Sequence, residues 1–200
     1  MKTFWTKEEI SISDELMELA PKLRDEFLEY HEDFHTTFKG GKPYSAANPH
    51  AILDDVPGKV DWKVEGLRYA LLEQKIEHNM FLDPKLSSNF PTAAELTKKY
   101  INHCGCSGYS ILEPMGLIRR HMDVENRSHK FVRIHIPLIV PGGEIGLEVN
   151  GHNLKWNDLF AFDNGEHHSA YNRTKERRLI YIIDITRSFL SIPKFERNHV

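Results

Sequence analysis

The spacing of hydrophobic residues predicts helices in the first half of the chain. From Ser13 to about Asp33, leucine and phenylalanine residues recur every three or four positions, which is typical of an amphipathic helix. Ser13 is suited to be the N-cap of this helix, and Pro21 is expected to break or restart it. A shorter helix is predicted after Pro91. The pattern of residues 61–74 is ambiguous and is compatible with a strand.

The second half has a different pattern, in which short apolar runs are separated by Gly, Pro, Asn and Asp. The runs are GYSILEP, KFVRIHIPLIV, EIGLEV, DLFAFD and RRLIYIIDIT. Many short strands with frequent turns predict an all-β sandwich or barrel of the jelly-roll type. The fold class is therefore mainly β with N-terminal helices (α+β). We expect one domain over residues 1–200, because no linker separates a helical or mixed part (1–105) from the jelly-roll core (106–190).

The composition is that of an ordinary globular protein and narrows the classes of function. Hydrophobic residues make up 40% of the chain and charged residues 28%. The net charge of -3 offers no basic excess for nucleic acid, and no apolar run approaches the roughly 18 residues of a membrane span. No signal peptide is evident, and Cys104 and Cys106 are too close for a stapling disulfide. We therefore expect a cytoplasmic protein with neither a nucleic-acid nor a membrane partner.

The chain contains twelve histidines, and two groups of them suggest a metal site. His121 and Asp123 are two residues apart, which places both side chains on one face of an extended segment. A distant histidine would complete the two-His, one-carboxylate triad that binds Fe(II). His167 and His168 follow a strand-like run, and neighbouring residues of an extended chain point in opposite directions, so at most one of the two is expected at such a site. By itself, an H-x-D triplet also occurs by chance in surface loops.

Basic residues in the apolar runs indicate that an anionic ligand could bind in the sandwich. Arg178 opens the last run, ten residues after His168. A buried arginine in a sandwich requires an anionic partner, and a dicarboxylate cosubstrate would provide one. Arg133 and His135 face the same side of another apolar run, either as a paired core network or as the lining of a site.

Taken together, these spacings resemble the aspartyl/asparaginyl β-hydroxylase family of Fe(II)- and 2-oxoglutarate-dependent oxygenases. The resemblance covers about Tyr109 to Thr186. Its matching positions are Ser110, eleven residues before His121; Arg133 and His135 as R-x-H; Phe162-Asp163 before His168; and Arg178, ten residues after His168. The segments HMD and HSA are also similar to those of bacterial proline cis-hydroxylases.

The resemblance implies a double-stranded β-helix (jelly-roll, cupin-like) core that carries an iron site. His121, Asp123 and His168 would hold Fe(II), with His168 rather than His167 as the second histidine. The resemblance further implies that Arg178 and Ser110 bind the far carboxylate of 2-oxoglutarate. It assigns Arg133 and His135, more loosely, to the near carboxylate or the substrate.

The implied activity is hydroxylation of an amino-acid side chain at an unactivated C–H bond. 2-Oxoglutarate and O2 are consumed, and succinate and CO2 are released. The resemblance allows Asp or Asn in a protein or peptide, or a free amino acid such as proline, as the substrate. The segments expected around the mouth of the sandwich match nothing that would decide between these substrates.

Two other classes of function compete with this interpretation. HEDFH matches the H-E-x-x-H pattern of zinc metalloproteases, with His31 and His35 as ligands and Glu32 as the base. A non-catalytic jelly-roll binding protein is the third class.

Other histidines and tryptophans are expected to have structural or surface roles. His129, His152 and His199 lie in polar surroundings and are expected to be exposed, and Trp62 and Trp156 are expected in the core or at its rim. HCGC is expected to be a turn that leads into a strand.

Overall fold

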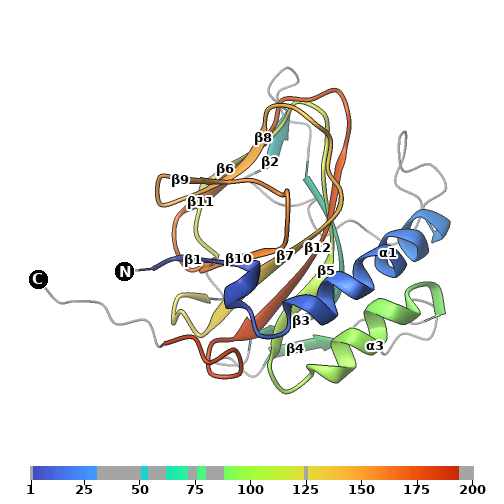
Figure 1. Ribbon diagram of the computed structural model, residues 1–200, viewed down its shortest axis with the longest axis vertical. Helices are drawn as coiled ribbons and strands as arrows, with labels where there is room; N and C mark the ends of the chain where they lie inside the picture. Colours follow the sequence, from blue (N-terminus) through green and yellow to red (C-terminus); the bar gives the residue numbers. More distant parts are fainter. Residues whose placement is uncertain are drawn as a thin grey trace, which may run out of the picture.

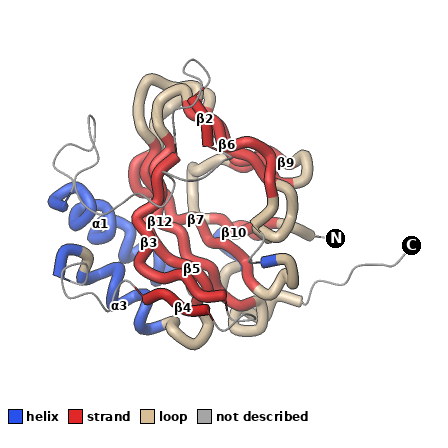
Figure 2. Tube along the Cα trace, turned by 180° about the vertical axis from the view of Figure 1, so that it is seen from behind, coloured by secondary structure: helices blue, strands red, loops and turns tan. Residues whose placement is uncertain are grey.

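The computed structural model describes residues 2–30, 51–53, 62–71, 76–79, 88–123 and 126–193, with the backbone alone between residues 51 and 79. These residues form two antiparallel sheets that face each other, with two helices outside the larger one (Figure 1). Seen from behind, both helices lie on the side of the larger sheet that faces away from β6 and β9 (Figure 2).

The strands of the two sheets alternate along much of the chain. In spatial order, the larger sheet has β1 (Phe4–Thr6), β10 (Phe160–Phe162), β7 (Phe131–Ile139), β12 (Arg178–Thr186), β5 (Cys104–Leu112), β3 (Trp62–Leu71) and β4 (Ile76–Asn79). The smaller sheet has β2 (Ala51–Leu53), β6 (Gly116–His121), β11 (His168–Asn172), β8 (Ile145–Val149) and β9 (His152–Leu154). From β5 to β8, and again from β10 to β12, consecutive strands belong to opposite sheets. This is the winding of a jelly roll, so the predicted fold class is confirmed.

Two apolar layers result from the alternation of side chains along these strands. The inner layer lies between the sheets and includes Ile118, Leu147, Phe162 and Ile182. The outer layer joins the other face of the larger sheet to the helices. Because residues i and i+2 of a strand share a face, polar side chains on the inner face are directed into the space between the sheets.

The helix α1 (Ser13–Tyr30) passes through Pro21, so the expected break at this proline is wrong. Leu16, Leu23 and Phe27 are fully buried on both sides of the proline. Their burial contributes about 1.5–3 kcal/mol each, which together exceeds the roughly 3 kcal/mol cost of a proline inside a helix. Tertiary packing therefore keeps the helix continuous.

The second helix, α3 (Pro91–Lys99), begins at the predicted proline and is capped by α1. The Glu26 carboxylate of α1 accepts hydrogen bonds from the backbone N–H groups of Thr92 (2.8 Å) and Ala93 (3.0 Å). A carboxylate at this position satisfies free N–H groups and interacts favourably with the helix dipole. The Tyr109 hydroxyl shares its one hydrogen between this carboxylate, at 2.8 Å, and the carbonyl of Leu23, at 3.0 Å, which ties both helices to the sheet.

The N-terminal half contributes more strands than its hydrophobic pattern suggests. Residues 61–74 contain the strand β3, which pairs with β5, and the short β1 pairs with β10. The described part of residues 1–105 therefore contains both helices and strands. The expected boundary at residue 105 falls inside β5, which begins at Cys104. Of the HCGC segment, His103 therefore lies in a turn as expected, whereas the other three residues already belong to the strand. A three-residue run such as Phe4–Thr6 is too short to show a period.

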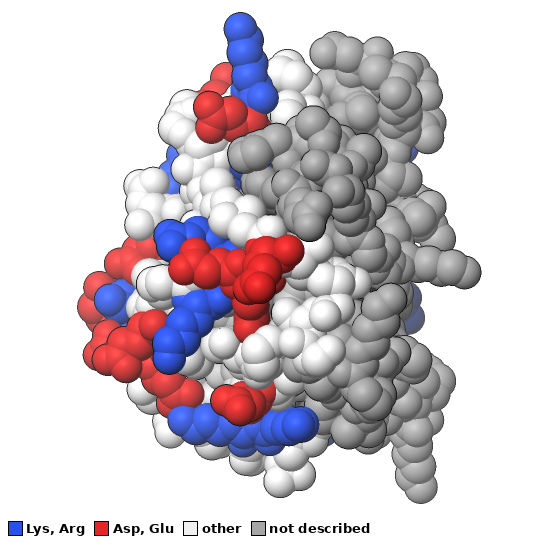
Figure 3. Space-filling model, turned by 90° about the vertical axis from the view of Figure 1, so that its right-hand side faces the viewer, with Lys and Arg blue, Asp and Glu red and all other residues white. Residues whose placement is uncertain are grey.

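The surface over the helices carries charges of both signs. Figure 3 shows acidic and basic side chains side by side on this face. Lys99 pairs with Glu15 at 2.5 Å, and Arg24 pairs with Asp25 at 2.8 Å.

None of the described helices is long and apolar enough to cross a membrane. The HEDFH segment, with His31, lies outside the described residues.

Candidate active site

A β-bulge brings His121 into the space between the sheets. Ile118 of β6 pairs with Ala170 of β11, and His121 pairs with His168, so three steps along β6 oppose two along β11. A bulge of this kind redirects side chains. Both Ile118 and His121 consequently line the pocket, although they are three residues apart. The imidazole rings of His121 and His168 lie 4.3 Å apart between centroids.

Asp123 follows the end of β6 and is held by Asn164. The backbone N–H of Asp123 donates to the carbonyl of Asn164 at 2.9 Å, and the Asn164 side-chain amide donates to Asp123 Oδ2 at 2.9 Å. The other oxygen, Oδ1, lies 3.4 Å from Nε2 of His121 and 3.9 Å from Nε2 of His168. One ligand atom from each of the three buried side chains lies within 4.8 Å of the others, as a shared metal ion requires.

Hydrogen bonds orient both histidines for metal binding. Nδ1 of His121 donates to the carbonyl of Arg119 at 2.7 Å, and Nδ1 of His168 donates to the carbonyl of Glu166 at 2.9 Å. A carbonyl only accepts, so the proton is on Nδ1 and the lone pair of Nε2 faces Asp123. Burial lowers the pKa of His168 to about 4, which keeps its imidazole neutral at neutral pH.

The charge of Asp123 is stabilised by Arg133. Burial alone would raise the pKa of Asp123, but the Arg133 guanidinium and the hydrogen bond from Asn164 outweigh it and hold the pKa well below its ordinary value. Two imidazoles and one ionised carboxylate form the donor set that suits Fe(II) and leaves further coordination positions open. The three side chains therefore fit an iron ion of this type.

Arg133 has both of the roles that the sequence left as alternatives. It belongs to a buried ion-pair network, and it also lines the pocket. Its Nε and Nη2 donate to the carboxylate oxygens of Asp184 at 2.7 and 2.8 Å. Its Nη1 lies 2.5 Å from Asp123 Oδ2, and its side chain lines the pocket. Arg133 thus connects Asp184 of β12 to the carboxylate of the candidate metal site.

Arg178 lies at the opposite end of the pocket without a charged partner. Its Nη2 donates to Ser110 Oγ at 3.0 Å, while its Nε has no hydrogen-bond partner. None of the described residues forms an ion pair with it. Burial lowers the pKa of Arg178 to about 9, so the guanidinium remains charged at neutral pH. A buried cation without a counter-ion is costly, and this site is suited to an anion that enters the pocket.

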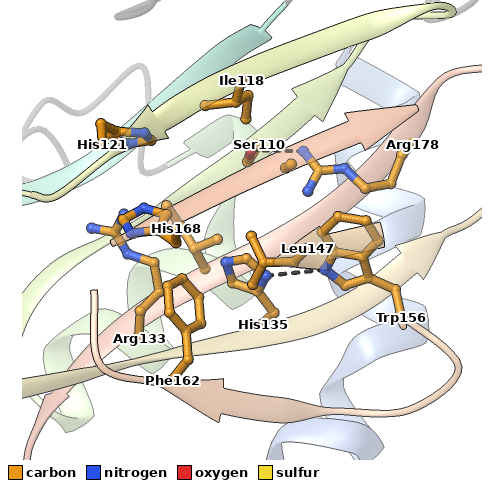
Figure 4. A pocket seen from close by; sticks show the side chains of 12 residues that line it. Ser110, Ile118, His121, Arg133, His135, Leu147, Trp156, Phe162, His168 and Arg178 are labelled. Carbon is orange, nitrogen blue, oxygen red and sulfur yellow. Dashed lines mark hydrogen bonds between the residues drawn. The ribbon is translucent and has the colours of Figure 1, made fainter. Parts of the chain in front are cut away.

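His135 lies between these two ends, and Trp156 lies beside Arg178 (Figure 4). The Trp156 indole N–H donates to Nδ1 of His135 at 3.0 Å. Burial, together with the nearby Arg178 guanidinium, holds the pKa of His135 well below its ordinary value. His135 is therefore a neutral imidazole in the middle of the pocket.

The pocket is a mainly apolar space with polar groups at defined places. It contains about 400 Å³ of space not filled by atoms, part of it open to solvent. Apolar side chains from both sheets form its walls: Ile118, Leu147, Phe162, Ala170 and Ile182. A small dicarboxylate with one end at the His-Asp-His group and the other at Arg178 would match this arrangement.

The structure brings the seven residues predicted for the site into one region, and it separates the two adjacent histidines. His168 is buried in the pocket, whereas His167 is only half-buried and does not line it. Three further residues were not singled out for the site: Trp156, Asn164 and Asp184. Asp184 had a signal, because it is a charged residue in an otherwise apolar run, as Arg133 is.

The expectation that His129 is exposed is wrong. His129 is buried, and its Nδ1 lies 2.9 Å from Asp163 Oδ2. Asp163 also accepts from Arg187 at 2.5 Å and from the Asn126 amide at 3.2 Å. The polar residues around His129 in the sequence belong to a buried network. Trp156 is buried and His152 is exposed, as expected, while His199 lies outside the described residues.

Comparison with known proteins supports the same interpretation. A family model described as aspartyl/asparaginyl beta-hydroxylase matches residues 9–188. No curated protein matches the sequence.

Solved structures show only a distant likeness. A prolyl-4-hydroxylase from Pseudomonas putida is 12% identical, with 89% of each chain covered and a TM-score of 0.43. An oxidoreductase of the 2OG-Fe(II) oxygenase family from Burkholderia pseudomallei is 12% identical, with 64% of this chain and 69% of that chain covered and a TM-score of 0.40. A predicted oxalate decarboxylase from Thermotoga maritima is 21% identical, with 45% and 73% covered and a TM-score of 0.35.

Proposed function

The chain belongs to the aspartyl/asparaginyl β-hydroxylase family, and on that premise we propose that it is an Fe(II)- and 2-oxoglutarate-dependent dioxygenase. It would hydroxylate an unactivated C–H bond of an amino-acid side chain, in Asp or Asn of a protein or peptide or in a free amino acid such as proline. One observation carries this proposal. A buried His-Asp-His donor set lies in the same pocket as Arg178, an arginine that has no counter-ion among the described residues.

His121, Asp123 and His168 would hold the iron. Their donor atoms are two imidazole nitrogens and one carboxylate oxygen, and backbone carbonyls already fix both imidazoles in the form that binds metal. When bound, Fe(II) supplies the oxidising chemistry with 2-oxoglutarate and O2, which yields succinate, CO2 and the hydroxylated product.

Arg178 and Ser110 would bind the far carboxylate of 2-oxoglutarate. The guanidinium has donors left for a carboxylate, because Nη2 donates to Ser110 while Nε has no hydrogen-bond partner among the described residues. Arg133 and His135 would contact the near carboxylate or the substrate. The apolar walls would exclude water from the reacting groups, which strengthens the electrostatic interactions inside the pocket.

The test is an anaerobic titration with Fe(II) and 2-oxoglutarate, followed through the visible charge-transfer band of the chelate. The band is expected in the unmodified protein and should disappear in His168→Ala. His167→Ala is the matched control and should keep the band. It should also disappear in Asp123→Ala and weaken in Arg178→Ala.

Substrate class is then tested by succinate release with free amino acids and with peptides that contain Asp or Asn. An absent band together with retained zinc would contradict the proposal and favour a hydrolase that uses His31, Glu32 and His35. Formation of the band with no turnover on any amino acid or peptide would indicate a binding protein built on the same fold.

A further inference from the structure

Trp156 contacts two of the groups that face the candidate cosubstrate. It lies in the loop between β9 and β10 and is 2% exposed. Its indole N–H donates to Nδ1 of His135 at 3.0 Å, and the Arg178 guanidinium lies over its ring, 4.8 Å from the centroid. Figure 4 shows this indole beside both side chains at the end of the pocket away from His121.

The hydrogen bond from Trp156 determines which nitrogen of His135 carries the proton. An indole N–H can only donate, so Nδ1 of His135 must accept, and the proton of this neutral ring is on Nε2. Nε2 is directed into the pocket toward His168 (Figure 4). His135 therefore presents a hydrogen-bond donor to a ligand.

This tautomer is the opposite of the one that His121 and His168 adopt. In those two histidines Nδ1 donates to a carbonyl and Nε2 offers a lone pair, as a metal requires. A carbonyl at Nδ1 thus leaves Nε2 of His121 and His168 free to bind a metal, whereas the indole N–H at Nδ1 makes Nε2 of His135 a donor to an anion. Without the indole N–H, the ring of His135 would be free to take the other tautomer, whose Nε2 lone pair repels a carboxylate.

We infer that Trp156 is a positioning residue for the cosubstrate: it holds His135 as a donor to an oxygen of the bound 2-oxo acid and supports Arg178 at the far carboxylate. This inference rests on the proposed function. A merely space-filling tryptophan would need neither the hydrogen bond nor the placement of its ring against the guanidinium.

The experiment compares Trp156→Phe with Trp5→Phe. Trp5 is a matched control, because it is also buried, at 6% exposure, and also lies under an arginine, with Arg187 4.9 Å from its ring centroid. Trp5 does not line the pocket. Phenylalanine keeps an aromatic ring at either position and removes only the indole N–H and part of the ring.

Two readouts are expected to change in Trp156→Phe alone. In the ¹⁵N NMR spectrum of the metal-free protein, the ring nitrogens of His135 should shift from those of the Nε2–H tautomer to those of a mixture. The anaerobic affinity of the Fe(II)-loaded protein for 2-oxoglutarate should fall about tenfold, as expected for the loss of one hydrogen bond to a charged group. The Fe(II) affinity itself should stay unchanged, because Trp156 contacts none of the three candidate ligands.

A second variant keeps the inference testable if Trp156→Phe folds poorly. The amide of His135→Gln can donate from the position of Nε2 without help from the indole. In that background the further change Trp156→Phe should lower the affinity for 2-oxoglutarate less than twofold, so the two effects should not add.

The outcomes separate this inference from the proposed function. Loss of 2-oxoglutarate affinity with a tautomer change in Trp156→Phe, but not in Trp5→Phe, supports the inference. Equal affinity in both variants, or a His135 tautomer that does not change, overturns it and leaves the proposed function standing. An unmodified protein that does not bind 2-oxoglutarate in the presence of Fe(II) overturns both.

Discussion

Arg133 and Asp184 form a bidentate ion pair across neighbouring strands, with N–O distances of 2.7 and 2.8 Å. The two residues are direct partners in the pairing of β7 with β12, and both are buried. The third guanidinium nitrogen, Nη1, reaches Asp123. Asp184 therefore fixes the direction in which Arg133 approaches a candidate iron ligand, although it does not itself line the pocket.

Replacing Asp184 by Asn should weaken both the fold and the metal site. Loss of one partner of a buried ion pair costs about 3–5 kcal/mol in the free energy of unfolding, because the other charge is left without compensation. Since Arg133 would lose its bidentate anchor, we expect Fe(II) affinity to fall roughly tenfold. Urea unfolding and anaerobic metal titration measure the two effects.

Asp14→Asn is the control for this substitution. The Asp14 side chain is 91% exposed and its pair with Lys7 is 3.7 Å long, so stability should change by less than about 1 kcal/mol and Fe(II) affinity should stay the same. A fully stable Asp184→Asn variant with unchanged Fe(II) affinity would show that Arg133 does not depend on Asp184.

Gly165 should be intolerant of a side chain although it lies outside the pocket lining. A β-carbon there would collide with the carbonyl oxygen of Asn126 and lie 2.9 Å from Nδ1 of His129. Asn126 hydrogen-bonds to Asn164, which in turn holds Asp123, so a shift of this turn reaches the candidate metal site. We expect Gly165→Ala to lose about 1–3 kcal/mol of stability and roughly tenfold in Fe(II) affinity.

The matched control for Gly165→Ala is Gly142→Ala. A β-carbon at Gly142 would meet nothing within 4 Å, so its stability should change by less than about 0.5 kcal/mol. Similar unfolding curves for the two variants would show that the turn at Gly165 can relax without disturbing Asp123.

The elements that sequence analysis predicted have a clear local pattern, either a helical period or a continuous apolar run. The apolar runs around Ile134 and Ile182 are central strands of the larger sheet, where both faces are covered and most residues are apolar. β6 escaped prediction as a strand because its end carries the exposed Arg119 and Arg120 and a bulge interrupts its alternation. The same bulge places His121 in the site, so the local irregularity that hides the strand also builds the pocket.

Some site residues could be predicted from the sequence and others could not. His121, Asp123 and His168 could be proposed from their residue types and spacing, because metal ligation restricts both. Asn164 and Trp156 could not, since their roles depend on which distant side chain each one meets. His129 was misjudged for the same reason, because its partner Asp163 lies 34 positions away along the chain. Contacts of this kind exist only after the sheets have paired.

Glu26 should contribute to stability through α3 and not through its own helix. Replacing it by Ala would remove the acceptor for two backbone N–H groups of α3 and for the Tyr109 hydroxyl. We expect a loss of about 1–2 kcal/mol, the usual cost of removing an N-terminal cap. Thermal unfolding measures this effect. Glu18→Ala, an exposed position on α1, is the control and should leave the melting temperature unchanged.

Arg178 and Arg187 are both buried, but their environments predict opposite effects of substitution by Met. Arg187 donates to Asp163 at 2.5 Å and to the carbonyl of His129 at 2.8 Å. Arg187→Met would leave Asp163 buried without its cation and should cost about 3–5 kcal/mol in the free energy of unfolding. Arg178 has no such carboxylate among the described residues. Arg178→Met should therefore stabilise the ligand-free protein by about 1–4 kcal/mol, because it removes an uncompensated buried charge.

The ligand should reverse this order. At a concentration of 2-oxoglutarate about 100 times its Kd, binding adds about 2.7 kcal/mol to the stability of the unmodified Fe(II)-loaded protein. Arg178→Met should gain almost nothing under the same conditions, since the far carboxylate has lost its partner. Guanidinium unfolding with and without 2-oxoglutarate, under anaerobic conditions, tests both parts. If Arg178→Met destabilised the ligand-free protein as much as Arg187→Met does, the Arg178 guanidinium would already be compensated within the protein. The proposal that it binds an anionic ligand would then be contradicted.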